Sequence, residues 1–198
     1  MARLTRERIL EAARAQLGRY GPRKMSLADV ARALGVSKAA LYHHFPGGKH
    51  EILGAVLDAE GDRILARMRA AAEAASDPRE RFRGAVLARL HHLAWLREVL
   101  GIGKEVGEEI RALCEVQERR FAAGERALFE AILEDGQRRG IFRDASRERL
   151  ARGVQNALRD LETTLVFAED GETEATVDEL FDVLFYGIVR PEAGGREP

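Results

Sequence analysis

Cysteine is almost absent from this sequence: Cys114 is the only one among 198 residues. A single thiol excludes an intrachain disulfide and a cysteine-rich metal site. We expect Cys114 to be a small buried apolar residue, with a redox sensor as the alternative. Long apolar runs are missing too, since none approaches the ~18 residues that a membrane span needs and no signal-peptide segment follows Met1. We therefore expect a cytoplasmic protein that does not enter a membrane.

The sequence also lacks the short motifs of common enzyme classes. It contains no Gly-x-Ser-x-Gly sequence, and the pair His91-His92 has no nucleophile close by. Residues 101–103 read Gly-Ile-Gly, like the start of a dinucleotide fingerprint, but Val106 stands where the third glycine belongs. We therefore expect no catalytic residue, no cofactor and no metal site.

Basic residues are concentrated at the amino-terminal end. The formal net charge of the whole chain is −1. Residues 1–50 contain ten Lys or Arg and three Asp or Glu, a balance of +7, which leaves −8 for the remainder. A basic segment on an otherwise acidic protein is typical of contact with phosphates. Solvation of a surface would explain the charge, but not its clustering around the motif described below.

Helical periodicity runs through almost the whole chain, without useful β-alternation or internal repeats. Glycine and proline sequences separate the periodic segments. The helices expected from these patterns span residues 5–20, 26–34, 38–44, 49–75, 78–97, 110–139, 146–169 and 174–188. A break in the early turns of 110–139 would bring their number to about nine. The sequence therefore predicts an all-α protein.

A helix-turn-helix pattern lies between residues 26 and 49. Ser26 can cap the first helix, with Asp29 three residues later in a capping-box arrangement. Gly35 provides the left-handed backbone that a tight turn between helices needs. Ser37 can cap a short second helix. The outer face of that second helix carries hydroxyl, cationic and aromatic hydrogen-bonding groups, as a helix that lies on DNA would.

Residues 5–53 resemble the DNA-binding domain of the TetR family of bacterial regulators. The residues that carry the resemblance are Gly21, Ser26, Leu27, Val30, Ala31, Gly35, Val36, Ser37, Leu41, Tyr42, His44, Phe45 and Lys49. Three features depart from the pattern: Met25 replaces a common threonine, Ala39 replaces a common glycine, and the 46–48 link is one residue longer than usual. The resemblance implies a three-helix DNA-binding domain at 1–48 and a larger helical domain for effector binding and dimerisation at 49–198.

The resemblance also implies a homodimeric repressor that binds a palindromic operator in double-stranded DNA. Lysine in the major groove favours guanine acceptors, and alanine favours the thymine methyl group. Cations, serine hydroxyls and helix amino termini are expected at phosphates. For Tyr42, packing beneath the helix is the alternative to DNA contact. The candidate DNA-binding residues are Arg23, Lys24, Ser26, Ser37, Lys38, Ala39, Ala40, Tyr42, His43, His44 and Lys49. Neighbouring helix residues point about 100 degrees apart, so His43 and His44 are not expected to share a metal ion.

The last two expected helices carry wide apolar stripes that must be buried against something. One interpretation is intrachain core. The other, implied by the resemblance, is a four-helix bundle with a second copy across a two-fold axis. The candidate interface residues are Leu150, Val154, Leu158, Leu161, Leu165, Val177, Leu180, Phe181, Leu184, Phe185 and Ile188.

The middle of the chain is the expected site of a small-molecule effector. A tryptophan beside a histidine pair gives an apolar body with polar groups, which is typical of a ligand pocket. The candidate pocket residues are Phe82, Val86, Leu90, His91, Trp95, Leu113, Val116, Phe121, Leu128, Phe129 and Ile132, ahead of His92. Ordinary core packing is the alternative for each. By analogy with relatives we expect an apolar ligand, such as a fatty acyl chain or its CoA thioester.

Two interpretations of the whole protein remain open at this point. In the first, ligand binding releases the repressor from DNA, and the helix at 49–75 transmits the change because it joins both domains. In the second, the protein is a DNA-bound interaction protein that recruits a protein partner and senses no small molecule. An exposed apolar patch in place of an enclosed cavity would favour the second.

Overall fold

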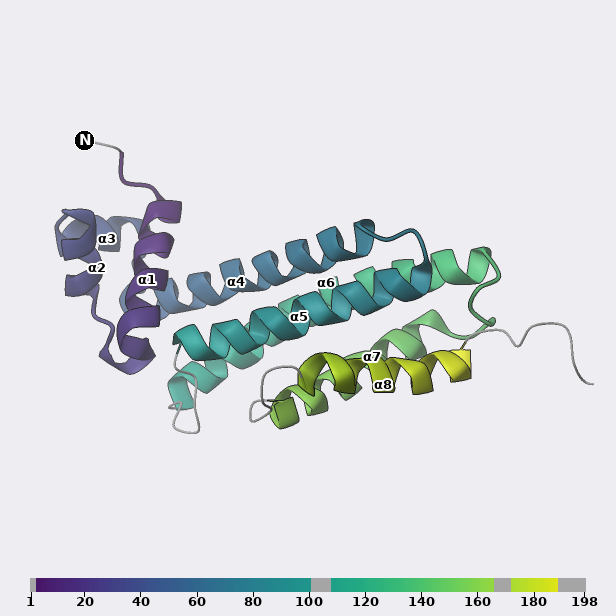
Figure 1. The fold of residues 1–198 in the computed structure, drawn as a ribbon. Helices are drawn as coiled ribbons and strands as arrows, with labels where there is room; N and C mark the ends of the chain where they lie inside the picture. The colour runs from purple at the N-terminus through teal and green to yellow at the C-terminus, as the bar shows by residue number, and fades with distance from the viewer. Residues whose placement is uncertain (1–2, 101–107, 166–171, 189–198) are drawn as a thin grey trace, which may run out of the picture. The chain divides into compact units, whose positions relative to one another are not determined.

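The computed structural model describes residues 3–100, 108–165 and 172–188, and within these ranges it leaves out some side chains (Figure 1). The described residues form eight helices and no β-strand, which confirms the all-α class. They are α1 (Arg6–Lys24), α2 (Leu27–Leu34), α3 (Lys38–His44), α4 (Gly48–Glu73), α5 (Pro78–Leu100), α6 (Glu108–Arg138), α7 (Arg147–Leu165) and α8 (Glu172–Ile188). The expected number was about nine, and the difference arises because 108–138 forms one uninterrupted helix.

No helix in the described part combines the length and the apolar character that a membrane crossing requires. Cys114, for which we expect burial, has no described side chain.

Helix α1 continues further than its sequence suggests. Its start is capped by Thr5, whose Oγ1 accepts a 3.3 Å hydrogen bond from the Arg8 amide. Gly21 breaks the helical path, with φ 72° and ψ 167°, and one further turn then runs through Pro22 to Lys24. The predicted break is confirmed, but the predicted end at residue 20 falls short by that turn. Proline is tolerated there because the preceding break leaves it near the start of a new turn.

The other helix boundaries follow local signals. Pro78 begins α5, and Asp77 Oδ1 accepts a 2.7 Å hydrogen bond from the Arg79 amide. Gly140 follows α6 with a φ of 71°. Ser146 Oγ accepts a 3.4 Å hydrogen bond from the Arg149 amide at the start of α7. These ends agree with the sequence prediction to within a few residues.

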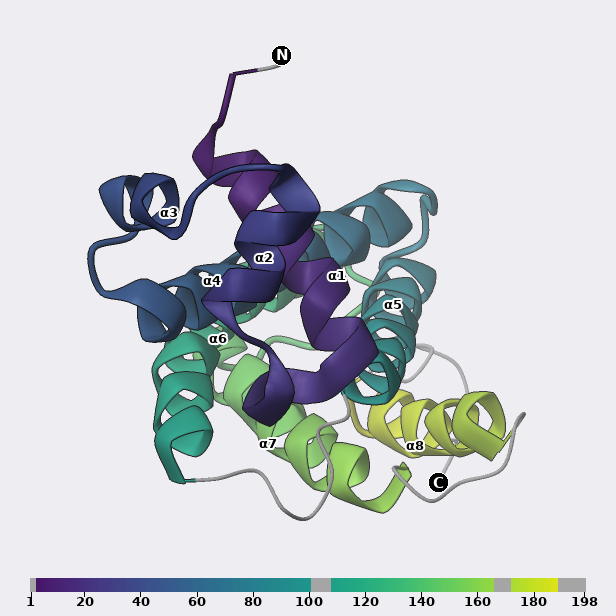
Figure 2. The ribbon, with the colours of Figure 1, turned by 90° about the vertical axis from the view of Figure 1, so that its left-hand side faces the viewer.

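The chain divides into two compact units that share helices α4, α5 and α6. The first contains Met1–Arg63 and His92–Phe121, and the second contains Ile64–His91 and Ala122–Pro198. In the first unit α2 packs against both α1 and α3 (Figure 2). The buried core of this part consists of Ile9, Ala13, Leu17, Met25, Leu27, Val30, Ala31, Leu41, Phe45, Ile52, Leu53 and Val56. The domain boundary expected at residue 48 stays a prediction.

Stacked aromatic side chains occupy the core of the second unit. The rings of Phe82 on α5 and Phe129 on α6 stack with their centroids 4.8 Å apart. Phe181 on α8 meets Phe82 edge to face at 5.9 Å. These three rings are buried, so apolar packing holds α5, α6 and α8 together in this unit.

Candidate nucleic-acid interface

Helix α2 is fixed at its start by the predicted capping residue. Ser26 has an extended backbone, and its Oγ accepts a 3.2 Å hydrogen bond from the Asp29 amide. The same hydroxyl donates a 2.5 Å hydrogen bond to Asp29 Oδ2. This bond and the nearby Arg32 guanidinium lower the pKa of the Asp29 carboxyl. The start of α2 therefore carries a negative charge where the helix dipole favours one.

The turn between α2 and α3 has the geometry that Gly35 permits. Its φ and ψ are 66° and 34°, in the left-handed region, as predicted. The Gly35 amide donates to the Arg32 carbonyl at 3.2 Å, and the Val36 amide donates to the Ala31 carbonyl at 3.0 Å. This pair of bonds is a Schellman motif, which satisfies the last carbonyls of a helix. The direction of α3 relative to α2 is thereby set by backbone hydrogen bonds.

Helix α3 has one buried face and one exposed face. Ser37 caps it, with Oγ accepting a 3.2 Å hydrogen bond from the Ala40 amide. Leu41, together with Phe45 just beyond the helix, is buried in the core. The candidate DNA-reading residues are more accessible: Ser37, Lys38, Ala39, Tyr42 and His43 are exposed, and Ala40 and His44 are half-buried. Tyr42 is 48% exposed, and its ring lies beside Gly48, so its contact with DNA stays a prediction.

The far end of α3 is held by residues from two other helices. Arg6 on α1 donates a hydrogen bond from Nη1 to the His44 carbonyl. Its guanidinium carbon lies 3.9 Å from the centroid of the Phe45 ring. Its Nη2 lies 3.5 Å from Oε1 of Glu51 on α4, and Oε2 of Glu51 accepts a 2.9 Å hydrogen bond from the Gly47 amide. Sequence reasoning did not identify Arg6 or Glu51, because their contacts lie outside the helix-turn-helix pattern.

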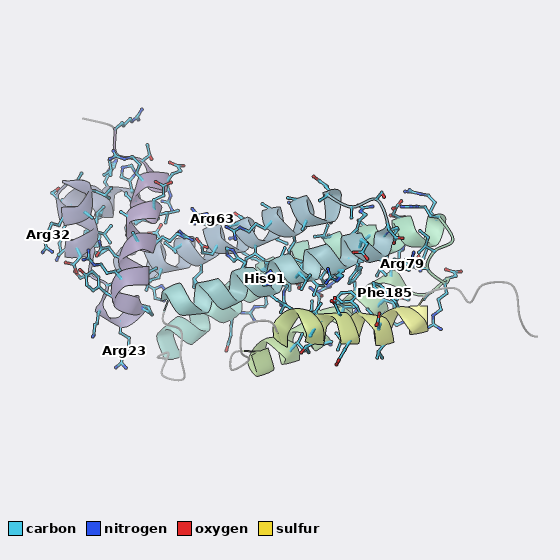
Figure 3. All side chains as sticks on the ribbon, in the orientation of Figure 1. Arg23, Arg32, Arg63, Arg79, His91 and Phe185 are labelled. Atoms are coloured by element: carbon cyan, nitrogen blue, oxygen red, sulfur yellow. The ribbon has the colours of Figure 1, made fainter. Side chains whose placement is uncertain are left out.

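The candidate phosphate-binding cations lie around this motif. Arg23 and Lys24 are exposed at the end of α1, and Figure 3 shows Arg23 and Arg32 pointing away from the helices. Lys49 Nζ donates a 3.3 Å hydrogen bond to the Arg23 carbonyl. Lys49 therefore lies next to Arg23, which groups two candidate cations at one place.

The described residues include no group of three or more His, Cys, Asp or Glu side chains arranged to hold a metal ion. His43 and His44 instead face each other edge to face, with ring centroids 5.5 Å apart.

The candidate effector residues are distributed over both units. Phe82, Val86, Leu90, Phe129 and Ile132 are buried in the second unit, and Leu128 there is half-buried. His91 is exposed, whereas its neighbour His92 is 1% exposed. Phe121 is half-buried, and the side chains of Trp95, Leu113 and Val116 lie outside the described part. The effector pocket stays a prediction.

A groove of about 650 Å³ lies elsewhere in the second unit. Its walls are Ala127, Glu130, Ala131, Glu134, Gln137, Asp144, Ala145, Ser146, Arg147 and Glu148, none of them a predicted pocket residue. Its wall side chains are mainly acidic and small, whereas apolar ligands are bound by mainly apolar and aromatic walls.

The two apolar stripes are each divided between core and surface. Val154, Leu158, Val177 and Phe181 are buried within the second unit, as the intrachain interpretation expects. Leu150, Leu161, Leu180, Leu184 and Phe185 are half-buried, and Leu165 and Ile188 have no described side chains. Beside them, Gly153 and Ala157 on α7 and Val183 on α8 are exposed. A second apolar strip therefore lies next to the buried one.

Comparison with known proteins agrees with this geometry. Residues 9–56 match the family described as "Bacterial regulatory proteins, tetR family". The repressor KstR2 of Mycobacterium tuberculosis is 32% identical over 83 residues, which are 42% of this chain and 41% of KstR2. The chain therefore matches less than half the length of this curated relative.

Solved structures resemble the whole chain. The TetR-family regulator PfmR from Thermus thermophilus has a TM-score of 0.57 and 28% identity, covering 96% of this chain and 100% of PfmR. FadR from Bacillus subtilis, solved in complex with stearoyl-CoA, has a TM-score of 0.66 and 17% identity, covering 93% of this chain and all of FadR. Proteins of this family are DNA-binding regulators and not enzymes. Residues 9–56 are therefore similar to the helix-turn-helix part of the TetR family of bacterial regulatory proteins, and the all-helical fold of the chain resembles that of a TetR-family regulator.

Proposed function

We propose that this protein is a homodimeric repressor that binds a palindromic operator through α3. One observation carries this proposal: α3 buries Leu41 while it exposes Lys38, Tyr42 and His43. A capped helix with a polar, cationic and aromatic outer face fits the major groove of duplex DNA.

Two groups of residues have different roles in this proposal. Lys38, Ala40, Tyr42 and His43 contact base edges and determine sequence preference. The remaining candidates, Arg23, Lys24, Ser26, Ser37, Ala39, His44 and Lys49, contact the backbone or allow its close approach. The first group sets specificity, whereas the second sets most of the salt-dependent affinity.

We infer that the protein acts as a homodimer because one seven-residue helix makes few contacts. Two copies of α3 on successive major grooves would double those contacts on a palindrome. The surface we assign to the second copy consists of Leu150, Gly153, Ala157 and Leu161 on α7 and Leu180, Val183 and Leu184 on α8. Exposed small residues on α7 would let a partner helix approach closely, and apolar area beside them would stabilise the contact.

We further propose that the effector is a small, largely apolar molecule of the fatty acyl or acyl-CoA type. Two kinds of observation support this class. The second unit has an apolar and aromatic interior that includes Phe82 and Phe129. FadR of the same fold was solved with stearoyl-CoA. The effector would release DNA by favouring a conformation in which the two α3 helices no longer match successive grooves, ~34 Å apart.

Selection from random duplex DNA by the purified full-length protein tests the DNA-binding part. We expect a palindromic consensus whose two half-sites are separated by about one helical turn, ~10 base pairs. Lys38→Ala and Tyr42→Ala should each abolish enrichment while the dimer stays intact. Tyr20→Ala is the matched control, because Tyr20 on α1 is 45% exposed against 48% for Tyr42. Enrichment that survives both α3 substitutions would show that the recognition helix is assigned wrongly.

The effector part is tested on the selected duplex. Stearoyl-CoA and free stearate are added separately, and the affinity for DNA is measured by fluorescence anisotropy. A lower affinity with either probe supports the proposed ligand class. Equal affinities with and without both probes reject that class and favour the alternative, a DNA-bound protein that recruits a protein partner.

A further inference from the structure

The orientation of α3 depends on its neighbours because the helix is short. It has seven residues, and helices of this length are not stable alone in water. Its start is fixed by the Ser37 cap and the turn at Gly35. Its last turn needs separate support, because the carbonyls at a helix end have no partner within the helix.

Arg6 and Glu51 provide that support from both sides of the link after α3. Arg6 donates a hydrogen bond to the His44 carbonyl and lies over the Phe45 ring, while Glu51 accepts a hydrogen bond from the Gly47 amide. The two side chains also pair with each other, with 3.5 Å between Nη2 and Oε1. The start of α1, the end of α3 and the start of α4 therefore meet at one ion pair.

We propose that Arg6 and Glu51 are positioning residues that set the angle at which α3 meets DNA. The proposal rests on the function proposed above, in which α3 reads base edges. Base-edge contacts require side chains held to within ~0.5 Å and 10–20 degrees, which a helix anchored at one end cannot guarantee. Neither residue needs to touch a base for this role.

The contribution of this pair to folding is small. The side chains of Arg6 and Glu51 are 50% and 36% exposed, and exposed ion pairs add little to stability. The hydrogen bonds to His44 and Gly47 act on the last turn and the link only. Loss of either residue should therefore change DNA recognition more than it changes the melting temperature.

A direct contact between Arg6 and a phosphate is the competing explanation, and the sign of the Glu51 effect separates the two. If only charge mattered, Glu51→Gln would remove a negative charge near the DNA and tighten binding to every duplex. If Glu51 holds the link after α3, the same substitution weakens binding to the selected duplex. Arg6→Met would lower the slope of log K against log salt by about one unit only if Arg6 itself neutralises a phosphate.

The test uses the full-length protein, the duplex selected by it and a scrambled duplex of equal length. Affinities of Arg6→Met, Arg6→Lys and Glu51→Gln are measured over a range of salt concentrations. We expect Arg6→Met and Glu51→Gln to weaken binding to the selected duplex about tenfold, comparable to one mismatched base pair, with an unchanged salt slope. Binding to the scrambled duplex should change less than about twofold, since that binding is electrostatic. Arg6→Lys should fall in between, because lysine keeps the charge and loses the planar stacking.

Arg79→Met is the matched control, since it breaks an ion pair to Asp77 with similar exposures of 46% and 34% at the start of α5. Arg79→Met should change neither the affinity for the selected duplex nor the affinity for the scrambled duplex. Melting temperatures of all variants show whether they are folded. The proposal is overturned if Arg6→Met and Glu51→Gln bind the selected duplex like the wild type, or if Arg6→Met reduces the salt slope while Glu51→Gln tightens binding. If the wild type selects no duplex, the proposed function itself fails, which is a different outcome.

Discussion

Arg14 on α1 donates a 2.6 Å hydrogen bond from Nε to Oε1 of Glu60 on α4, and that carboxylate is 1% exposed. Arg63 donates to the same oxygen, and Nε2 of His92 on α5 lies 3.3 Å from the other one. One buried carboxylate thus joins three helices of the first unit. A buried charge is tolerated only when paired and hydrogen-bonded, so the three partners and Glu60 depend on one another.

Glu60→Gln should destabilise the protein strongly. The substitution preserves the shape of the side chain but removes the charge that two guanidinium groups and an imidazole face. Breaking a buried pair in this way costs about 3 kcal/mol of unfolding free energy. Urea denaturation followed by circular dichroism measures the change. Glu73→Gln, at an exposed position of the same helix, is the control and should stay within about 0.5 kcal/mol of the wild type. Equal midpoints for Glu60→Gln and the wild type would contradict the prediction.

The same carboxylate predicts a defined loss of stability in acid. Burial alone raises the pKa of Glu60, but the bonds and charges of His92, Arg14 and Arg63 outweigh burial and lower the pKa from 4.5 to about 2. Because the folded pKa is the lower one, the contribution is complete above pH ~4.5 and is lost as the pH falls towards ~2. A shift of this size corresponds to about 3 kcal/mol. Between pH 6 and pH 2 the unfolding free energy should fall less steeply with pH for Glu60→Gln than for the wild type. Parallel pH dependences of the two proteins would refute this assignment.

A second buried ion pair lies in the other unit. Nε of Arg89 on α5 is 2.5 Å from Oε1 of Glu125 on α6, with side chains 7% and 2% exposed. Gln155 donates a 2.9 Å hydrogen bond to the other carboxylate oxygen. Burial raises the pKa of Glu125, although the charge of Arg89 opposes that effect. Glu125 therefore depends on Arg89 to remain ionised in the core.

Arg89→Met should cost about 3–5 kcal/mol of stability, because it leaves the Glu125 carboxylate buried without its cation. The double variant Arg89→Met with Glu125→Leu should recover most of that loss, since apolar replacements of similar volume are often neutral. The Arg89→Met variant should also lose less stability near pH 4.5 than at pH 7. Because the pKa of the Glu125 carboxyl is raised in the folded protein, folding becomes less favourable as the pH rises and this carboxyl ionises. A double-mutant cycle in urea measures the coupling. Additive losses in the double variant would show that the pair is not coupled.

The helix-turn-helix could be predicted from sequence because its determinants are local. Ser26, Gly35 and Ser37 act on residues within a few positions, and the structure gives each the predicted backbone and hydrogen bonds. The same holds for the start of α5, which Pro78 marks, and for the end of α6, which Gly140 marks. Side-chain chemistry at helix ends is sufficient for these assignments.

Contacts between residues that are far apart in the sequence could not be predicted in this way. Arg14 and Glu60 are 46 residues apart, and many other arginines could have paired with that carboxylate. His91 and His92 are neighbours on α5 and point about 100 degrees apart, so the packing around the helix decides which one is buried. The apolar stripe on α7 likewise did not show that Val154 and Leu158 face the interior while Gly153 and Ala157 face outward. Such assignments require the packing of the whole unit.

Gly136 should be irreplaceable for steric reasons. A Cβ atom at this position of α6 would lie 2.1 Å from Cδ2 of Phe142, a buried ring. The ring cannot move away without disturbing the core, so Gly136→Ala should destabilise by about 1–3 kcal/mol. Gly61→Ala on α4 is the control, because its nearest neighbour is Phe121 Cβ at 4.0 Å. It should stabilise by about 0.5–1 kcal/mol through higher helix propensity. Equal thermal shifts for the two variants would contradict this explanation.

The exposed strip on α7 and α8 predicts how the dimer can be separated. Val183 is 77% exposed in the single chain, so Val183→Glu should leave the fold intact while it places a charge in the proposed apolar contact. We expect the dissociation constant of the dimer to rise at least about tenfold. Affinity for the palindrome should fall with it, because each copy then binds one half-site alone.

Analytical ultracentrifugation over a range of concentrations measures the dimer, and circular dichroism verifies folding. Ala70→Glu adds the same charge at an exposed position of α4 and should leave the dimer unchanged. A folded Val183→Glu protein that dimerises like the wild type would show that the dimer interface does not include this strip. The proposal of a homodimer would be refuted if the wild-type chain stayed monomeric at micromolar concentration and on the selected duplex. Two recognition helices could then not act together on one operator.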